Sequence, residues 1–187
     1  MILGIDAVRE GNATRFSGRG KIHYGDPVNA DDAWSERVRR IAAFFHDCGV
    51  PFVVPADMVR SLWFKFMINV GINQASAVLG APYGAFQAPG DARELMESAM
   101  RETVMLSQSL GTGLVQADIA AWGETLARLA PDGKTSMLQD VEAGRKTEVD
   151  AFAGTVMALA EPKGLAVPVN RTLFRLIRAI ERGRATA

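Results

Sequence analysis

The sequence places one lysine and two asparagines at four-residue intervals within an apolar stretch. Lys65, Asn69 and Asn73 are the polar side chains of the run that starts at Leu62, in which every other residue up to Ile72 is apolar apart from Gly71. Residues four apart share one side of a helix, so the three form a stripe. A helix that is apolar nearly all round is buried, where an unpaired polar group costs roughly 2–7 kcal/mol. The pattern favours a ligand-binding groove, with a desolvated lysine that can release a proton and two carboxamides suited to a small hydroxy or keto acid.

The competing interpretation of this pattern is the solvated face of an amphipathic helix. Asparagine lies roughly 0.6 kcal/mol below alanine as an interior helix residue, so two of them need a reason where glutamate or lysine would serve better. The stripe is also narrow, whereas a solvated face usually carries several charges. The groove is the better interpretation, and the solvated face stays open as the alternative.

A second polar cluster, further along the chain, contains Ser136 and Glu148. Ser136 is followed three residues later by Gln139, which matches a capping box and predicts Ser136 as a helix N-cap. A helix N-terminus also offers free N–H groups to a carboxylate, so binding is the alternative for Ser136. Glu148 can likewise be a surface residue paired with Arg145 or Lys146.

The composition describes a globular protein and excludes several classes. The chain has 187 residues, of which 48% are hydrophobic and 22% charged, values typical of a folded domain. It carries 21 basic and 21 acidic residues, which argues against a nucleic-acid partner because such proteins usually have a basic excess. Two histidines and the single Cys48 are too few for the usual zinc site or an internal disulfide, so we expect no metal and a reducing compartment.

The sequence lacks the common signals for export, membrane insertion and nucleotide binding. The first charge, Asp6, comes too early for a signal peptide, and the apolar run at 62–72 is too short to span a bilayer. We therefore expect a cytoplasmic protein without a membrane partner. Neither the phosphate loop nor the GxGxxG dinucleotide fingerprint is complete anywhere in the sequence.

Hydrophobic periodicity predicts a small α/β segment followed by an all-α region of about six helices. The expected strands lie at 2–8, 13–16, 21–24 and 50–54, with a turn at 18–20 and a helix at 33–48 whose cap candidates are Asn29, Asp31 and Asp32. The expected helices of the second region lie at 57–79, 91–110, 116–129, 136–143, 146–160 and 170–182, with Asp91 as an N-cap. The fold class is therefore mainly α.

Three motifs in this order resemble the ketopantoate reductase (2-dehydropantoate 2-reductase) family. They are the run from Leu62 to Asn73, the Ser136-Met137-Leu138-Gln139-Asp140 segment with residues 145–150, and Gly164 to Asn170. The resemblance covers nearly all of residues 20–180. It implies a Rossmann domain that binds NADPH, joined to a multi-helix domain similar to the C-terminal domain of 6-phosphogluconate dehydrogenase, with the active site in the cleft between them. The implied reaction reduces 2-dehydropantoate, or a related 2-keto acid, to the 2-hydroxy acid in pantothenate and coenzyme A biosynthesis.

The resemblance also assigns roles by position. Lys65 matches the family's catalytic lysine, which protonates the alkoxide as hydride reaches the keto carbon. Asn69 and Asn73 match substrate-binding amides, Ser136 matches the serine at the carboxylate end of the substrate, and Glu148 matches the acid that contacts the cofactor ribose. A further substrate-binding asparagine of the family is replaced near Tyr83, which leaves the exact keto acid open.

The domain organisation that the resemblance implies is incomplete. Residues 1–55 match the last part of a Rossmann-type NADP-binding domain, and residues 56–187 match the helical substrate and catalytic domain. The glycine fingerprint would lie upstream of Met1, so we expect NADPH binding to require that region and this chain alone to be inactive. We expect a homodimer or other self-association, because Ile22 and Val53 would normally pack on further strands. The alternative class is a non-catalytic helical module for dimerisation or small-acid binding.

Overall fold

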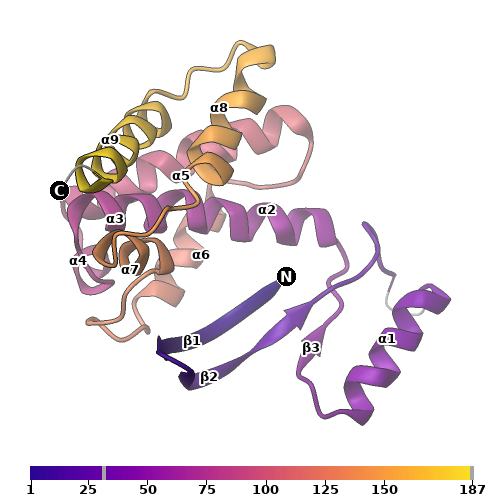
Figure 1. Cartoon of the computed structure of the whole chain (residues 1–187). Coiled ribbons are helices and arrows are strands. Elements are labelled where there is room, and N and C mark those ends of the chain that lie inside the picture. The colour runs from indigo at the N-terminus through magenta and orange to yellow at the C-terminus, as the bar shows by residue number, and fades with distance from the viewer. Residues whose placement is uncertain (31–32, 186–187) are drawn as a thin grey trace. The chain divides into compact units, whose positions relative to one another are not determined.

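The computed structural model describes the backbone of residues 1–30 and 33–185, and their side chains apart from residues 3–10, 16–19 and 184–185 (Figure 1). The chain forms two compact units, residues 1–62 and residues 63–187. The first contains the sheet and one helix, and the second is helical, which confirms the mainly α fold class. The division at residues 55 and 56 stays a prediction.

The first unit is built on a long β-hairpin. Strands β1 (Ile2–Glu10) and β2 (Ala13–His23) pair antiparallel around a two-residue turn whose Gly11 has φ +60°, a conformation that glycine adopts without strain. The expected turn at 18–20 is wrong, because β2 runs through it. The register of the β1–β2 pairing shifts between Asp6 and Ala7, as it does at a β-bulge.

A parallel crossover completes the first unit. Strand β3 (Phe52–Val53) pairs parallel with β2, and helix α1 (Glu36–Asp47) connects the two strands, since a parallel connection needs a long crossover. The rings of Tyr24 and Phe45 meet edge to face at 5.3 Å. The N-cap of α1 is Ser35, whose side chain accepts a hydrogen bond from Val38 N, so Asn29 is not the cap. The other cap candidates, Asp31 and Asp32, lie outside the described residues.

The second unit is helical within each segment that the periodicity predicts as a helix, although two of these segments are divided into shorter pieces and most ends are shifted. Its elements are α2 (Met58–Ile68, which begins in the first unit), the π-helical turn η1 (Asn69–Asn73), α3 (Gln74–Leu79), α4 (Gly84–Gln87), α5 (Asp91–Leu110), α6 (Ala117–Leu126), α7 (Ser136–Glu142), the π-helical turn η2 (Asp150–Gly154), α8 (Thr155–Ala160), the 3₁₀ turn η3 (Glu161–Lys163) and α9 (Pro168–Ala185). Helix α4 was not expected, and the N-cap of α5 is Gly90 instead of Asp91.

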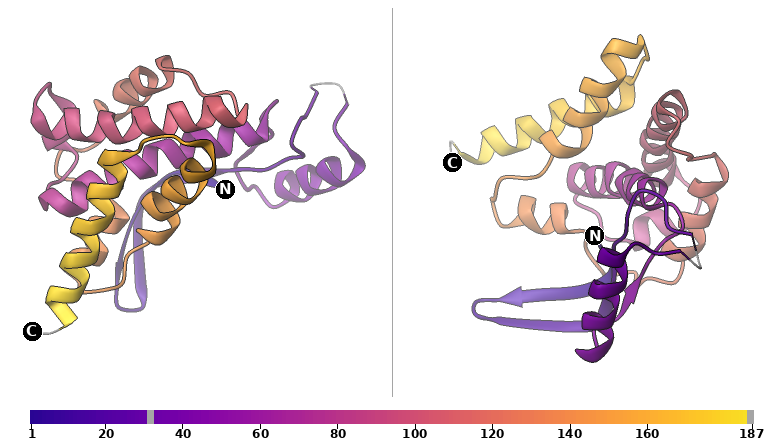
Figure 2. Two further views of the ribbon diagram at one scale, coloured as in Figure 1. Left: turned by 90° about the horizontal axis from the view of Figure 1, so that it is seen from above. Right: turned by 90° about the vertical axis from the view of Figure 1, so that its right-hand side faces the viewer.

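The expected single helix over 57–79 is a rod of three pieces, α2, η1 and α3. We call residues 58–79 the rod. Helix α5 runs alongside it (Figure 2) and contacts both η1 and α3. The contact is close at Gly71, where an added Cβ would lie 2.5 Å from Met100 Cγ. Glycine at this position therefore permits the rod to lie directly against α5.

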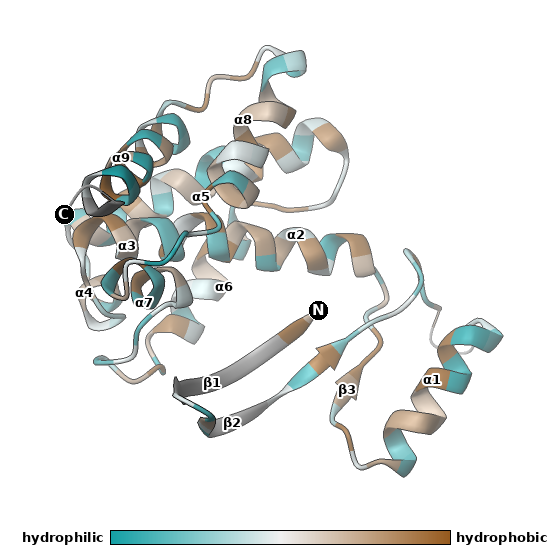
Figure 3. Cartoon of the chain, in the orientation of Figure 1, coloured by the Kyte–Doolittle hydropathy of each residue, from teal (hydrophilic) through white to brown (hydrophobic). Residues whose placement is uncertain are grey.

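The rod packs into the second unit through apolar side chains, and polar side chains occur between them along its length. Figure 3 shows hydrophobic and hydrophilic residues mixed along α2 and α3. Met67 and Ile72 of the rod are buried in one core cluster with Met96 and Met100 of α5.

Within residues 1–30 and 33–185, no helix combines the length and the apolar character that a membrane crossing requires.

Candidate active site

The stripe, by which we mean Lys65, Asn69 and Asn73, lies on the rod around its π turn. Lys65 is in the last turn of α2, and the two asparagines are the first and last residues of η1. In a regular α-helix, residues four apart overshoot a full turn by about 40°, so Asn73 would lie about 80° around the helix from Lys65. A π turn contains more residues per turn, which brings Asn73 back toward the line of Lys65. The irregular turn therefore improves the alignment on which the groove interpretation depends.

The stripe is partly withdrawn from solvent, and its amides are not used by the fold. Lys65 and Asn69 are half-buried and Asn73 is buried, which contradicts a solvated face. Burial lowers the pKa of the Lys65 ammonium below its ordinary value. No hydrogen bond involves the carboxamide of Asn69 or Asn73 in the described part of the chain, although most buried polar groups in proteins are hydrogen-bonded. Both amides are therefore open to a ligand.

Ser136 lies at the first position of α7, and its predicted capping role is wrong. The N-cap is Thr135, whose Oγ1 accepts a hydrogen bond from Leu138 N at 3.1 Å. Thr135 Oγ1 also donates to Ser76 Oγ of α3 at 3.2 Å, and α7 contacts both α3 and η1. Because its neighbour performs the capping, the exposed Ser136 is left for another role beside the rod.

Tyr83 packs on the loop that leads into α7. Its backbone N–H donates to the carbonyl of Gly133 at 2.9 Å. An added Cβ on Gly133 would lie 2.9 Å from the Tyr83 ring. The backbone of Tyr83 is therefore hydrogen-bonded to this loop three residues before Ser136, and its ring leaves no room for a side chain at Gly133.

Glu148 is exposed and precedes the second π turn, η2, which contacts η1. Of the two alternative partners for Glu148, Arg145 instead pairs with Asp140 at 2.7 Å. The segment is held by Thr147, whose backbone N–H and hydroxyl both donate to Glu181 Oε1 of α9 at 2.8 Å. The stripe thus lies around one π turn and Glu148 lies just before another, and the two turns contact each other. Such turns are frequent at functional sites.

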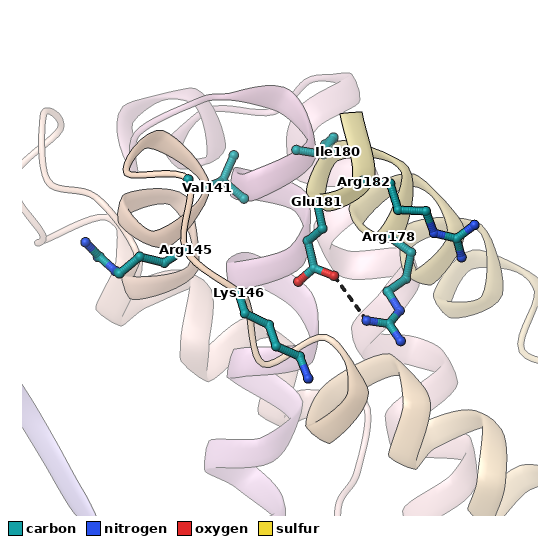
Figure 4. A pocket seen from close by; sticks show the side chains of 8 residues that line it. Val141, Arg145, Lys146, Arg178, Ile180, Glu181 and Arg182 are labelled. Carbon is teal, nitrogen blue, oxygen red and sulfur yellow. Dashed lines mark hydrogen bonds and ion pairs between the residues drawn. The ribbon is translucent and has the colours of Figure 1, made fainter. Parts of the chain in front are cut away.

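A pocket of about 350 Å³ lies between the segment before Glu148 and α9 (Figure 4). Burial raises the pKa of Glu181 in its wall, but hydrogen bonds from Thr147 and Arg178 outweigh this effect, and the net shift is downward. Arg145 and Arg182 point away from Glu181 in Figure 4, and Arg178 also pairs with Asp150 at 3.6 Å. The cations do not converge, and the candidate site residues do not line this pocket.

A second set of polar residues, missed by the sequence analysis, connects the rod to helices α5 and α9. Gln74, Glu102 and Asn170, which we call the buried network, are hydrogen-bonded to one another and buried. The sequence did contain a signal for the π turn next to this network: Gly71 and two asparagines, which are poor interior helix residues, fall within an expected helix.

The described part of the chain holds no cluster of three or more histidine, cysteine, aspartate or glutamate residues that could bind a metal ion.

Comparison with known proteins gives one family. The sequence model described as "Ketopantoate reductase PanE/ApbA C terminal" matches residues 57–181. A 2-dehydropantoate 2-reductase of Halobacterium salinarum is 33% identical over 173 residues, which are 92% of this chain and 56% of that protein. The chain therefore spans little more than half the length of this relative.

Solved structures share the fold at lower identity. D-mandelate dehydrogenase in complex with NADH and anilino(oxo)acetate superposes with a TM-score of 0.84 at 19% identity, over 97% of this chain and 59% of that one. The dimeric ketopantoate reductase of Staphylococcus aureus gives 0.82 at 19% identity, over 97% and 61%. D-mandelate dehydrogenase and ketopantoate reductase thus share the fold of this chain. The family model over residues 57–181 shows that the chain belongs to the ketopantoate reductase family and contains its C-terminal domain.

Proposed function

We propose that this chain supplies the substrate side and the catalytic lysine of an NADPH-dependent reductase, which converts 2-dehydropantoate or a related 2-keto acid into the 2-hydroxy acid in cytoplasmic pantothenate biosynthesis. The observation that carries the proposal is the stripe: a half-buried lysine of lowered pKa, aligned with two amides that the fold leaves open. Family membership supports the same reaction class.

The chemistry divides into hydride and proton transfer. Bound NADPH supplies the hydride to the keto carbon. The Lys65 ammonium donates its proton to the carbonyl oxygen, so that the C=O group becomes CH–OH and the lysine is left neutral. Its lowered pKa favours this transfer because the proton is held less tightly.

The remaining candidate residues bind and orient. Asn69 and Asn73 have N–H donors and a carbonyl acceptor each, which suit the hydroxyl and keto oxygens of the acid. The hydroxyl of Ser136 is exposed at the start of α7 and would bind the carboxylate end. The exposed carboxylate of Glu148 can accept hydrogen bonds from the ribose hydroxyls of a nicotinamide nucleotide.

The test joins this chain to the nucleotide-binding region of a full-length relative and follows NADPH oxidation with 2-dehydropantoate. We expect turnover in this fusion and its loss in Lys65→Ala, with Lys163→Ala, an exposed lysine of η3, as the matched control. A fusion that binds NADPH but reduces no 2-keto acid would contradict the proposal. Titration of the unfused chain with NADPH, followed by nicotinamide fluorescence, tests whether cofactor binding needs the added region.

Self-association is the second part of the proposal. The S. aureus enzyme is described as dimeric. In this chain, α5 and α9 form an apolar groove of about 250 Å³ that includes Leu95, Leu173 and the exposed Leu176. Light scattering after size exclusion should give about twice the mass of 20.2 kDa, and a monomer at micromolar concentration would contradict it.

A further inference from the structure

The π turn of the rod leaves one main-chain carbonyl in an unusual position. In a regular α-helix, the carbonyl of Val70 would accept a hydrogen bond from the backbone N–H of Gln74, four residues on. Here the backbone N–H of Gln74 donates its hydrogen bond to the carbonyl of Gly71 instead. The side-chain amide of Gln74 donates to the Val70 carbonyl at 2.7 Å. A side-chain donor thus stands where the main-chain donor would be, and both belong to the same residue.

The amide of Gln74 is held in turn by two helices. Gln74 Nε2 also donates to Asn170 Oδ1 of α9 at 3.2 Å. Asn170 Nδ2 donates to Glu102 Oε2 of α5 at 2.8 Å, and the backbone N–H of Asn170 donates to the same oxygen at 2.9 Å. Gln74 and Asn170 are fully buried, at 0% exposure. The Val70 carbonyl is therefore connected through fixed groups to α5 and α9.

The π turn is also packed tightly against α5. Gly71 lies so near α5 that a Cβ would meet Met100 Cγ at 2.5 Å and the carbonyl of Met96 at 3.1 Å. The turn is thus pressed against α5 on one side and hydrogen-bonded through Gln74 on another. Asn69 and Asn73, which begin and end the turn, take their positions from this arrangement.

We propose that Gln74 is a positioning residue, which holds the π turn and thereby sets the places of the Asn69 and Asn73 amides. The part of this inference that concerns keto-acid binding rests on the proposed function. Without the Gln74 amide, the Val70 carbonyl is left to main-chain donors, and the α-helical offset of about 80° between Lys65 and Asn73 is no longer opposed by this contact.

The test uses the isotope-labelled chain and the variant Gln74→Met. Methionine is similar in length and has no donor, and it also removes Gln74 Oε1, which has no hydrogen-bond partner among the described residues. We therefore expect the variant to fold. Its side-chain amide signals of Asn69 and Asn73 should move in NMR spectra of the free chain, and its affinity for pantoate, the hydroxy-acid product, should fall roughly tenfold.

The matched control is Ser107→Ala on α5. Ser107 is fully buried, and its Oγ accepts a hydrogen bond from Leu114 N at 3.1 Å, a residue that belongs neither to the rod nor to the buried network. This variant should leave both asparagine signals and the pantoate affinity unchanged. Equal effects of the two variants, or unchanged asparagine signals in Gln74→Met, would overturn the inference.

A measurement on the unsubstituted chain covers the case in which Gln74→Met does not fold. The Gln74 side-chain amide protons should exchange with solvent far more slowly than those of Asn69 and Asn73, and equal rates would overturn the inference. If the unsubstituted chain binds no pantoate, the proposed function loses support, whereas the amide signals and exchange rates still decide the role of Gln74.

Discussion

The stripe and the buried network contain the same kinds of polar side chain but differ in their hydrogen bonding. In the buried network, the side-chain amides of Gln74 and Asn170 donate hydrogen bonds to other groups of the fold. In the stripe, Asn69 and Asn73 have amides that no hydrogen bond within the described residues uses. Buried polar groups are normally hydrogen-bonded, so amides without partners beside amides whose donors are all used favour a ligand at the stripe. Residue type alone does not separate the two sets, but the use of their amide donors does.

The strongest test of the stripe removes its charge. In the fusion with a nucleotide-binding region, Lys65→Met should lower kcat by about 10²–10⁴-fold, because general acid catalysis contributes this much. The variant should bind NADPH as the parent does. A kcat within twofold of the parent would remove Lys65 from the chemistry and make the stripe a binding feature only.

The pH profile tests the same lysine without a substitution. Reduction needs the protonated ammonium, so kcat should fall as pH rises through the Lys65 pKa, which burial places below 10.5. The folded chain binds fewer protons than the unfolded chain between that pKa and 10.5, so stability should rise with pH in this window. Thermal melts across the window check this, and Lys65→Met should abolish both dependences.

The buried network should respond in stability instead of catalysis. Asn170→Ala removes the amide that bonds both Gln74 and Glu102, and it should destabilise the chain by about 2–3 kcal/mol in urea unfolding. Thr172→Ala, on the exposed side of the same helix, should change stability by less than about 0.5 kcal/mol. Equal effects would show that the network is dispensable.

The two π turns provide a matched pair of glycines. Gly71→Ala should destabilise by about 1–3 kcal/mol, because its Cβ would overlap Met100. Gly154→Ala should be neutral, or stabilising by about 0.4–1 kcal/mol, since the nearest atom to its Cβ is 3.5 Å away. Thermal melts of both variants check this difference, and the reverse order would contradict the close approach of the rod and α5.

The smallest expected effects separate capping from binding at α7. Thr135→Ala should cost about 1 kcal/mol of stability as a lost N-cap. Ser136→Ala should leave stability within about 0.5 kcal/mol and weaken pantoate binding, measured by calorimetry. A Ser136→Ala chain that binds pantoate normally would exclude Ser136 from the site.

The local signals in the sequence predicted most of the helices but missed the irregular turns. The bounds of the helix at 91–110 agree with the structure, because its periodicity and its end signals agree, although its N-cap is Gly90 and not Asp91. The expected strand break at 18–20 was wrong, because pairing with β1 continues through the glycines. Capping at α7 was displaced by one residue, since Thr135 and Ser136 are both good caps and tertiary contact with Ser76 favours Thr135.

The sequence by itself determined the order of the elements, the mainly α class, the stripe and the family resemblance, all of which depend on spacing along one chain. Only the tertiary structure decided that the rod contains a π turn. Its causes, the approach of α5 at Gly71 and the hydrogen bonds that reach Asn170 and Glu102, come from residues distant in sequence. The balance between α and π pairing at Val70 is small, and it was set by packing that local propensity does not contain.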